Sequence, residues 1–222
     1  MNVWYNAAKA IVRSYSAIFI RSVQVFGQEN LPPGAKIIVA NHANMTDSFV
    51  LPFIIREKLH FLIQADAFYL PFFGALLRRA EQIPVSAGRG SEAIENAKKW
   101  LHRGDAVVIY PEGLLNHGET FHRAGTGAAR LAIESGAPII PLGFYVPDSY
   151  ARLMKWYAQG RDRFARWQFG GQCFITIGEP WHPFLEEMDK SYQSLRFLTQ
   201  QMMTQVMDLV EQAKEEASQY GI

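Results

Sequence analysis

Hydrophobic and polar positions change their spacing along the chain, and the two spacings predict helices and strands in turn. Residues 3–19 carry apolar side chains at the i, i+3, i+4, i+7 recurrence of an amphipathic helix. Short apolar runs, typical of buried strands, then alternate with further helical patterns. The predicted strands cover residues 22–28, 36–40, 59–64, 83–85, 106–110, 139–146 and 172–178. The predicted later helices cover about residues 45–55, 75–79, 91–102, 126–135 and 185–218. We therefore expect an α/β fold with a mixed, largely parallel sheet flanked by helices and an N-terminal amphipathic helix.

The 222 residues are enough for one large domain. We expect residues 1–21 to form the N-terminal amphipathic helix and residues 22–222 to form a single domain, with residues 147–171 as an insertion. The sequence leaves two interpretations of the helix open. It packs on the protein's own core, or it lies in a membrane interface with Trp4 and Tyr5 at the level of the lipid headgroups.

The insertion combines basic with aromatic side chains. Its basic residues are Arg152, Lys155, Arg161, Arg163 and Arg166. Its aromatic residues are Tyr150, Trp156, Tyr157, Phe164, Trp167 and Phe169. This mixture suits an anionic lipid surface, so we expect a membrane-facing segment. A helical subdomain with a charged outer face is the alternative.

Composition narrows the classes of function. The 22 basic and 21 acidic residues give a formal net charge of +1, which does not favour a nucleic-acid partner. The single cysteine, Cys173, excludes an internal disulfide and fits a reducing cytosol. No apolar run approaches the roughly 20 residues that span a bilayer. Lys9 and Arg13 interrupt the N-terminal apolar stretch, which argues against a secretory signal.

The candidate chemistry lies in residues 41–47, Asn-His-Ala-Asn-Met-Thr-Asp, which directly follow the predicted strand 36–40. Five helical steps would separate His42 and Asp47 by about 140°, so one helix face cannot hold both. We place His42 on the turn after the strand and Asp47 at the third position of the next helix, with Asn44 as its N-cap. A carboxylate on one imidazole nitrogen leaves the other nitrogen free to take a proton. The alternative is a hydrogen-bonded turn histidine beside a capping aspartate.

A second turn, Pro111-Glu112-Gly113, follows the predicted strand 106–110. In open parallel sheets, sites form beyond the carboxyl ends of the strands. We therefore expect His42 and Glu112 to share one crevice. The pair of His42 and Asp47 lacks a nucleophile, and no Gly-x-Ser-x-Gly motif occurs, so we expect the substrate to supply the attacking hydroxyl.

Four blocks stand in order along the chain. They are Asn41-His42 to Asp47, Pro71-Phe72-Phe73-Gly74 with Ile83-Pro84-Val85, Pro111-Glu112-Gly113, and Ala137-Pro138-Ile139-Ile140-Pro141. The blocks resemble the glycerolipid acyltransferase family of the His-x4-Asp type, which includes glycerol-phosphate and lysophosphatidate acyltransferases. Residues 121–132, with Gly125 leading into a helix, are also similar to this family. The resemblance covers roughly residues 25–145, and four blocks in register make it specific.

The resemblance implies an O-acyltransferase. Such an enzyme moves a fatty acyl chain from an acyl thioester, acyl-CoA or acyl carrier protein, to a hydroxyl of a lyso-lipid such as lysophosphatidate, in phospholipid biosynthesis. It implies that His42 is the general base and that Asp47 orients it. The residues implied to bind substrate are Asn41, Asn44, Arg89, Glu112, Gly113, Arg123 and Gly125. We further expect a cytoplasmic protein, peripheral on the inner face of a membrane, with no cofactor and no metal. His117 and His122 flank Glu119, but their spacing fits no zinc pattern.

Departures from the family pattern concern groups that would bind phosphate. Phosphate-binding members tend to carry a lysine where residues 64–66 read Gln-Ala-Asp, an arginine where residues 86–88 read Ser-Ala-Gly, and Thr-Arg-Ser where residues 114–116 read Leu-Leu-Asn. Phosphate favours charge-assisted donors, which Arg89, Arg123 or Arg130 could supply instead. An acceptor without a phosphate, such as another lipid or an amphiphilic alcohol, therefore stays open. Two other functions also stay open: a thioester or lipid hydrolase, and a lipid-binding module.

Overall fold

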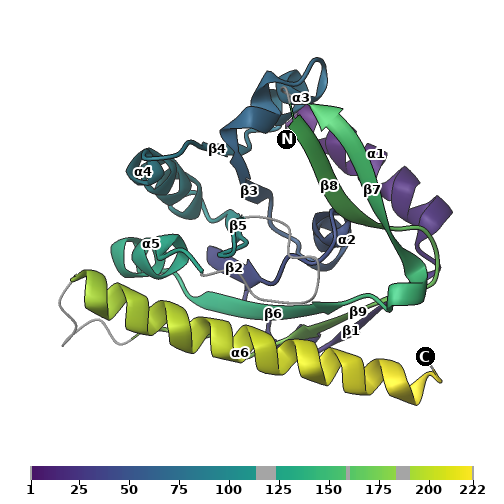
Figure 1. Ribbon diagram of the computed structural model, residues 1–222. Coiled ribbons are helices and arrows are strands. Elements are labelled where there is room, and N and C mark those ends of the chain that lie inside the picture. The colour runs from purple at the N-terminus through teal and green to yellow at the C-terminus, as the bar shows by residue number, and fades with distance from the viewer. Residues whose placement is uncertain (1, 114–123, 159–160, 184–190, 222) are drawn as a thin grey trace.

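A seven-stranded sheet forms the centre of the computed structural model, which describes residues 2–113, 124–158, 161–183 and 191–221 (Figure 1). In spatial order its strands are β1 (Ser22–Phe26), β9 (Gln172–Ile177), β6 (Ile139–Tyr145), β2 (Lys36–Ala40), β5 (Ala106–Ile109), β3 (Leu59–Gln64) and β4 (Ile83–Val85). Strands β6 and β9 pair antiparallel, and all other neighbours in this sheet pair parallel. This confirms the expected mixed, largely parallel α/β fold.

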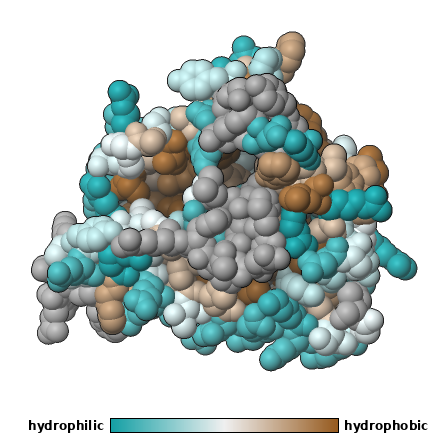
Figure 2. All heavy atoms as spheres, viewed as in Figure 1, coloured by the Kyte–Doolittle hydropathy of each residue, from teal (hydrophilic) through white to brown (hydrophobic). Residues whose placement is uncertain are grey.

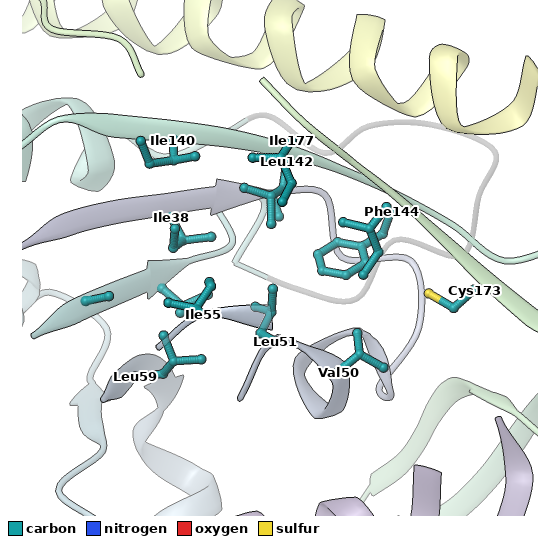
Figure 3. Packing of buried hydrophobic residues seen from close by; sticks show 14 of the residues in the cluster. Ile38, Val50, Leu51, Ile55, Leu59, Ile140, Leu142, Phe144, Cys173 and Ile177 are labelled. Atoms are coloured by element: carbon teal, nitrogen blue, oxygen red, sulfur yellow. The ribbon is translucent and has the colours of Figure 1, made fainter. Parts of the chain in front are cut away.

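Helices cover both faces of the sheet. They are α1 (Val3–Phe19), α2 (Asp47–Ile54), α3 (Phe73–Arg79), α4 (Gly90–Leu101), α5 (Gly127–Ser135) and α6 (Tyr192–Gln219), with short 3₁₀ turns η1 (Gln28–Asn30), η2 (Ala65–Tyr69) and η3 (Asp148–Tyr150). On one face, Val50 and Leu51 of α2 join Ile38 and Leu142 in a buried cluster (Figure 3). On the other face, α4, α5 and α6 pack over a second buried cluster. The core therefore lies on both sides of β2, β5 and β6.

Residues Ile37 to Ala40 of strand β2 are completely buried, because β2 lies between β5 and β6 with helices on both faces. Such strands lack an outward polar face, which explains the continuous apolar run in the sequence. Strands β2, β3 and β4 have the bounds that the sequence predicted. The predicted last helix begins only at Tyr192 in the described residues, and residues 184–190 lie outside them.

The insertion between β6 and β9 contains an antiparallel hairpin of β7 (Ala151–Ala158) and β8 (Arg161–Gln168). The register runs from the Ala151–Gln168 pair to the Ala158–Arg161 pair. The helical alternative for this segment is therefore wrong. Its mixed aromatic and basic composition fits a helix surface or a strand pair, and the cross-strand partner decides between them.

Helix α1 lies beside α2 and α3 and reaches the hairpin, as predicted for an amphipathic N-terminal helix (Figure 1). Its inner face packs through Tyr15, whose ring contacts Phe49 and Trp167 and whose hydroxyl donates to the Gln168 carbonyl oxygen at 2.5 Å. Its outer face exposes Val3, Ala7, Ile11 and Ile18, four apolar side chains at helical spacing. Among the residues that the structure describes, no helix combines the length and apolarity needed to span a bilayer.

Candidate active site

Strand β2 delivers the first site residues to the carboxyl edge of the sheet. The side chain of Asn41, which is buried, exchanges two hydrogen bonds with the backbone of Phe144 on β6: its Nδ2 donates at 2.9 Å and its Oδ1 accepts at 2.7 Å. These bonds anchor the chain immediately before His42. The Asn41 amide is thus engaged inside the protein, and its role in substrate binding stays a prediction.

His42 and Asp47 come together as the sequence analysis expected. Nδ1 of His42 lies 3.6 Å from Oδ2 of Asp47, and the two side chains are 16% and 1% exposed. This distance is longer than a hydrogen bond, as is common for catalytic groups before a substrate is bound. In the described part of the chain, Nδ1 has no hydrogen-bond partner. Nδ1 therefore faces the carboxylate, and Nε2 is the nitrogen left for a substrate.

The Asp47 carboxylate is held by its own turn. The Asn44 backbone N–H donates to Oδ2 at 2.7 Å, and the Asn44 side-chain amide donates to Oδ1 at 3.3 Å. The predicted helix start is wrong by two residues: Asp47 is the first residue of α2, and Thr46 stands at the N-cap position without a side-chain cap hydrogen bond. The bond from the Asn44 N–H to the Asp47 carboxylate is nevertheless the return bond of the predicted capping box. A carboxylate in the first helical turn also interacts favourably with the helix dipole. The turn is attached to the hairpin, because the Met45 N–H donates to the Arg166 carbonyl oxygen at 2.8 Å.

Tyr110, at the carboxyl end of β5, is a site residue that the sequence analysis missed. Its ring stacks on the His42 imidazole, with the centroids 4.0 Å apart and the planes 13° from parallel. Its hydroxyl shares a 3.0 Å hydrogen bond with Ser48 Oγ, next to Asp47. Burial, reinforced by the negative charge of Asp47, raises the pKa of Tyr110. The same two causes raise the pKa of the Cys173 thiol, in keeping with an inert buried cysteine.

The loop after β5 reaches the His42 turn directly. The buried Glu112 carboxylate accepts the His42 backbone N–H at 3.2 Å. Gly113 adopts a positive φ of 69°, which favours glycine, and its N–H donates to the Tyr110 carbonyl oxygen. The Gly125 N–H donates to the Pro111 carbonyl oxygen at 2.7 Å. The structure thus brings the His42 turn, the Glu112 loop and the segment before α5 to one edge of the sheet.

The arginines predicted as possible phosphate donors are less closely grouped than the residues around His42. Arg89 stands at the N-terminus of α4, 69% exposed and 3.9 Å from Glu92. Arg130 is bound to Glu134 and Ser91. Arg123 lies outside the described residues, as do residues 114–116 and His117, Glu119 and His122.

Two further features of the structure concern the binding of metal ions and of small molecules. No group of three or more histidine, cysteine, aspartate or glutamate residues in the described ranges could hold a metal ion. A surface hollow of about 520 Å³ is lined by residues 28–29, 31–33 and 54–57. These residues precede β2 or β3, so the hollow lies at the amino ends of the strands, away from His42.

Comparison with known proteins adds to this geometry. Residues 22–145 match the sequence model of a protein family described as Acyltransferase. A 1-acyl-sn-glycerol-3-phosphate acyltransferase of Pseudomonas aeruginosa is 27% identical over 123 residues, which cover 54% of this chain and 48% of that protein. A lyso-ornithine lipid O-acyltransferase of the same organism is 29% identical over 136 residues, which cover 58% of this chain and 51% of that protein. The chain thus spans about half the length of these curated relatives.

The fold has a counterpart among solved structures. The crystal structure of the 1-acyl-sn-glycerophosphate acyltransferase PlsC from Thermotoga maritima superposes with a TM-score of 0.65. The match covers 96% of this chain and 79% of that chain, at 22% sequence identity. At this identity the likeness establishes the fold alone.

Proposed function

The chain belongs to the acyltransferase family, whose model matches residues 22–145, and from that premise we propose that it transfers a fatty acyl chain from an acyl thioester to a hydroxyl group of a lyso-lipid. Family membership confirms the resemblance that the four sequence blocks indicated. The observation that carries the proposal is the juxtaposition of the His42 imidazole and the buried Asp47 carboxylate, 3.6 Å apart, beside the Glu112 loop.

In the proposed reaction His42 acts as the general base. Its Nε2 takes the proton of the acceptor hydroxyl as the oxygen attacks the thioester carbonyl carbon. Asp47 lies beside Nδ1 and offsets the positive charge that the imidazolium gains. The tetrahedral intermediate then expels the thiolate, which takes the proton back from the imidazolium. The products are an ester and a free thiol, and the enzyme returns to its starting state.

The donor is a thioester of coenzyme A or of acyl carrier protein, since both present the same reacting group. The acceptor has two candidates. The names of two relatives point to lysophosphatidate and to a lyso-ornithine lipid. Gln64, one of the three residues that stand where the family tends to carry a lysine, donates its amide to the Gly113 carbonyl oxygen at 2.7 Å, and Arg130 is paired with Glu134. These contacts favour an acceptor without a phosphate. Arg89, which is exposed, supports the phosphate-bearing acceptor instead.

Product analysis with the His42→Ala variant as control tests the proposal. The protein receives an acyl thioester and a panel of lyso-lipids with and without a phosphate, and the products are identified by mass spectrometry. We expect an acylated lipid with the unmodified protein. His42→Ala should lose about 10² to 10⁴-fold in rate, the usual contribution of a general base. Free fatty acid as the sole product would establish a hydrolase instead. Activity of His42→Ala within a few-fold of the unmodified protein would remove His42 from the reaction.

We further propose that the protein works as a peripheral protein on the cytoplasmic face of a membrane, where its acceptor resides. The apolar outer face of α1 and the basic, aromatic hairpin support this location. The membrane contacts would then come from the N-terminal helix, residues 1–21, and from the insertion, residues 147–171, of the single domain formed by residues 22–222.

A further inference from the structure

Phe72 is 93% exposed, more than any other large hydrophobic side chain in the described part of the chain. It stands between η2 and α3, in the block Pro71-Phe72-Phe73-Gly74. Single exposed hydrophobic residues are common and need no explanation. The backbone at Phe72, however, supplies a second and independent observation.

Phe72 adopts φ 59° and ψ −51°, and the Phe73 N–H donates to the Pro71 carbonyl oxygen at 2.6 Å. A hydrogen bond across one residue with a positive φ defines the strained form of γ-turn. A β-carbon is disfavoured here, and glycine would be the ordinary choice. The fold therefore holds a phenylalanine in an unfavourable backbone conformation while its ring contacts mainly solvent. Strained backbone of this kind clusters at functional sites.

Phe72 is one of six exposed apolar side chains on the neighbouring elements α1, η2 and α3 and the residues between them, which we term the aromatic ridge. Its members are Val3, Trp4, Tyr69, Leu70, Phe72 and Phe73, each between 38% and 93% exposed. The start of α1 is fastened to the end of α3, because Asn2 Nδ2 donates to the Arg79 carbonyl oxygen at 2.9 Å. The Arg79 guanidinium also lies over the Trp4 ring, 4.4 Å from its centroid. The ridge is thus built by three neighbouring elements, α1, η2 and α3, at the end of the molecule opposite α6 (Figure 1).

The chemistry of the ridge favours one occupant. Tryptophan, tyrosine and phenylalanine rings with adjoining arginines are the composition of a membrane interface. Arg78 and Arg79 are exposed in the last turn of α3, directly beside the ridge. Figure 2 shows hydrophobic residues at the surface at this end and along α1. The arginines complement anionic lipid headgroups, and the rings suit the acyl chains beneath them.

We propose that the turn at Phe72 is a wedge that inserts into a lipid bilayer containing anionic lipid. The Phe72 ring enters the acyl-chain region, while Arg78 and Arg79 stay at the headgroups. This assigns to residues 69–73 a membrane contact separate from the hairpin and adjoining the start of α1, whose Val3 and Trp4 belong to the same ridge. It extends the membrane location proposed above and does not depend on the identity of the acceptor.

Vesicle partitioning without any substrate tests the wedge. Phe72→Ser removes the ring, Phe72→Trp keeps an aromatic ring, and Phe197→Ser removes a 55% exposed phenylalanine from α6 as a matched control. The vesicles contain phosphatidylglycerol and phosphatidylcholine. Burying one phenylalanine in lipid corresponds to roughly a tenfold or greater gain in partitioning. We therefore expect Phe72→Ser to lose about that factor, and Phe72→Trp and Phe197→Ser to bind like the unmodified protein.

The insertion depth gives a second readout. The variant Phe72→Cys carries an environment-sensitive fluorophore, and the native Cys173 is buried and escapes labelling. Quenching by lipids with spin labels on their acyl chains supports the wedge. Unchanged partitioning of Phe72→Ser, equal losses in Phe72→Ser and Phe197→Ser, or an unquenched fluorophore would each overturn it. A loss of several degrees in the melting temperature of Phe72→Ser would also overturn it, since the ring would then pack in the fold. Because no substrate is present, absence of acyl transfer leaves this test unaffected.

Discussion

At the scale of single residues, the position of the His42 ring depends on Tyr110 as well as on Asp47. The two rings stack 4.0 Å apart, and the Tyr110 hydroxyl is bound to Ser48 in the first turn of α2. Tyr110 therefore links the strand that carries the Glu112 loop to the helix that carries Asp47. We infer that Tyr110 is a positioning residue, which restricts the rotation of the imidazole by stacking on it and takes no part in the proton transfer.

Two substitutions separate the ring of Tyr110 from its hydroxyl. Tyr110→Leu removes the stacked ring, and small misplacement of a reacting group costs up to about a hundredfold in rate. We expect Tyr110→Leu to lower kcat by about tenfold or more, with little change in KM, in an acyl-transfer assay. Tyr110→Phe keeps the ring and should retain kcat within a few-fold. Equal losses in both variants would assign the effect to the Ser48 hydrogen bond, and unchanged kcat in Tyr110→Leu would remove the positioning role.

The sequence predicted the local part of this site better than its long-range part. The five-residue spacing of His42 and Asp47 excluded a shared helix face, and the structure brings both side chains together across the turn. The start of the helix was misplaced by two residues, because α2 begins at Asp47 and Thr46 stands at the N-cap position without a side-chain cap hydrogen bond. Tyr110 was missed because its ring meets His42 through the pairing of β2 with β5, which no local pattern encodes.

At the scale of elements, the contact between α6 and β6 has no room for a side chain. A β-carbon at Gly143 would lie 2.3 Å from the Leu209 carbonyl carbon and 2.4 Å from the Val210 nitrogen. Both are backbone atoms of α6, so a substitution has to move the helix. Close approach of this kind fixes the position of α6 across the sheet.

Gly143→Ala should therefore destabilise the protein. Overpacking in a close-packed interior costs about 1–3 kcal/mol, and a backbone clash belongs at the upper end of that range. Gly90→Ala is the matched control, because a β-carbon at Gly90 meets nothing within 4 Å. Gly90 is the first residue of α4, where alanine is at least as favourable as glycine. Urea unfolding measures both, and equal free energies of unfolding for the two variants would contradict the close contact.

Elements were predictable where burial alone decides the pattern. The run of residues 36–40 is buried on both faces, and its strand was predicted with the correct bounds. The hairpin of β7 and β8 was not predicted, because each strand needs the other to satisfy its backbone and neither shows a clear alternation of apolar and polar residues. The bounds of the two strands are defined by their cross-strand register, which the sequence alone does not give.

At the scale of the whole molecule, the elements proposed to contact lipid lie away from α6 and next to the site. Figure 1 shows α1, α3 and the hairpin on the side of the sheet opposite α6. The hairpin is bonded to the His42–Asp47 turn through the Met45 N–H and the Arg166 carbonyl oxygen. A hairpin that rests on a membrane would therefore place the candidate catalytic turn close to lipid-borne acceptors. The division into residues 1–21 and 22–222 stays a prediction. In this arrangement residues 1–21 would serve as a membrane contact of the domain.

The hairpin contribution should be electrostatic and thus distinct from the apolar wedge at Phe72. Arg152 and Lys155 are exposed on β7, and each basic residue near an anionic surface contributes about 1 kcal/mol. The double variant Arg152→Gln with Lys155→Gln should weaken binding to phosphatidylglycerol vesicles by roughly thirtyfold at low salt, the equivalent of about 2 kcal/mol. The difference from the unmodified protein should shrink as salt shortens the screening length from about 10 Å at 0.1 M to about 3 Å at 1 M.

A control with the same change of charge decides whether location matters. Lys99→Gln with Lys214→Gln removes two exposed cations from α4 and α6, outside the proposed contact. If the orientation is correct, this variant binds vesicles much more tightly than the hairpin variant, because its altered charges face away from the lipid. Equal losses in the two double variants would mean that the molecule responds to net charge alone. The hairpin would then have no special place at the membrane, and its contact with the His42–Asp47 turn would serve only the fold.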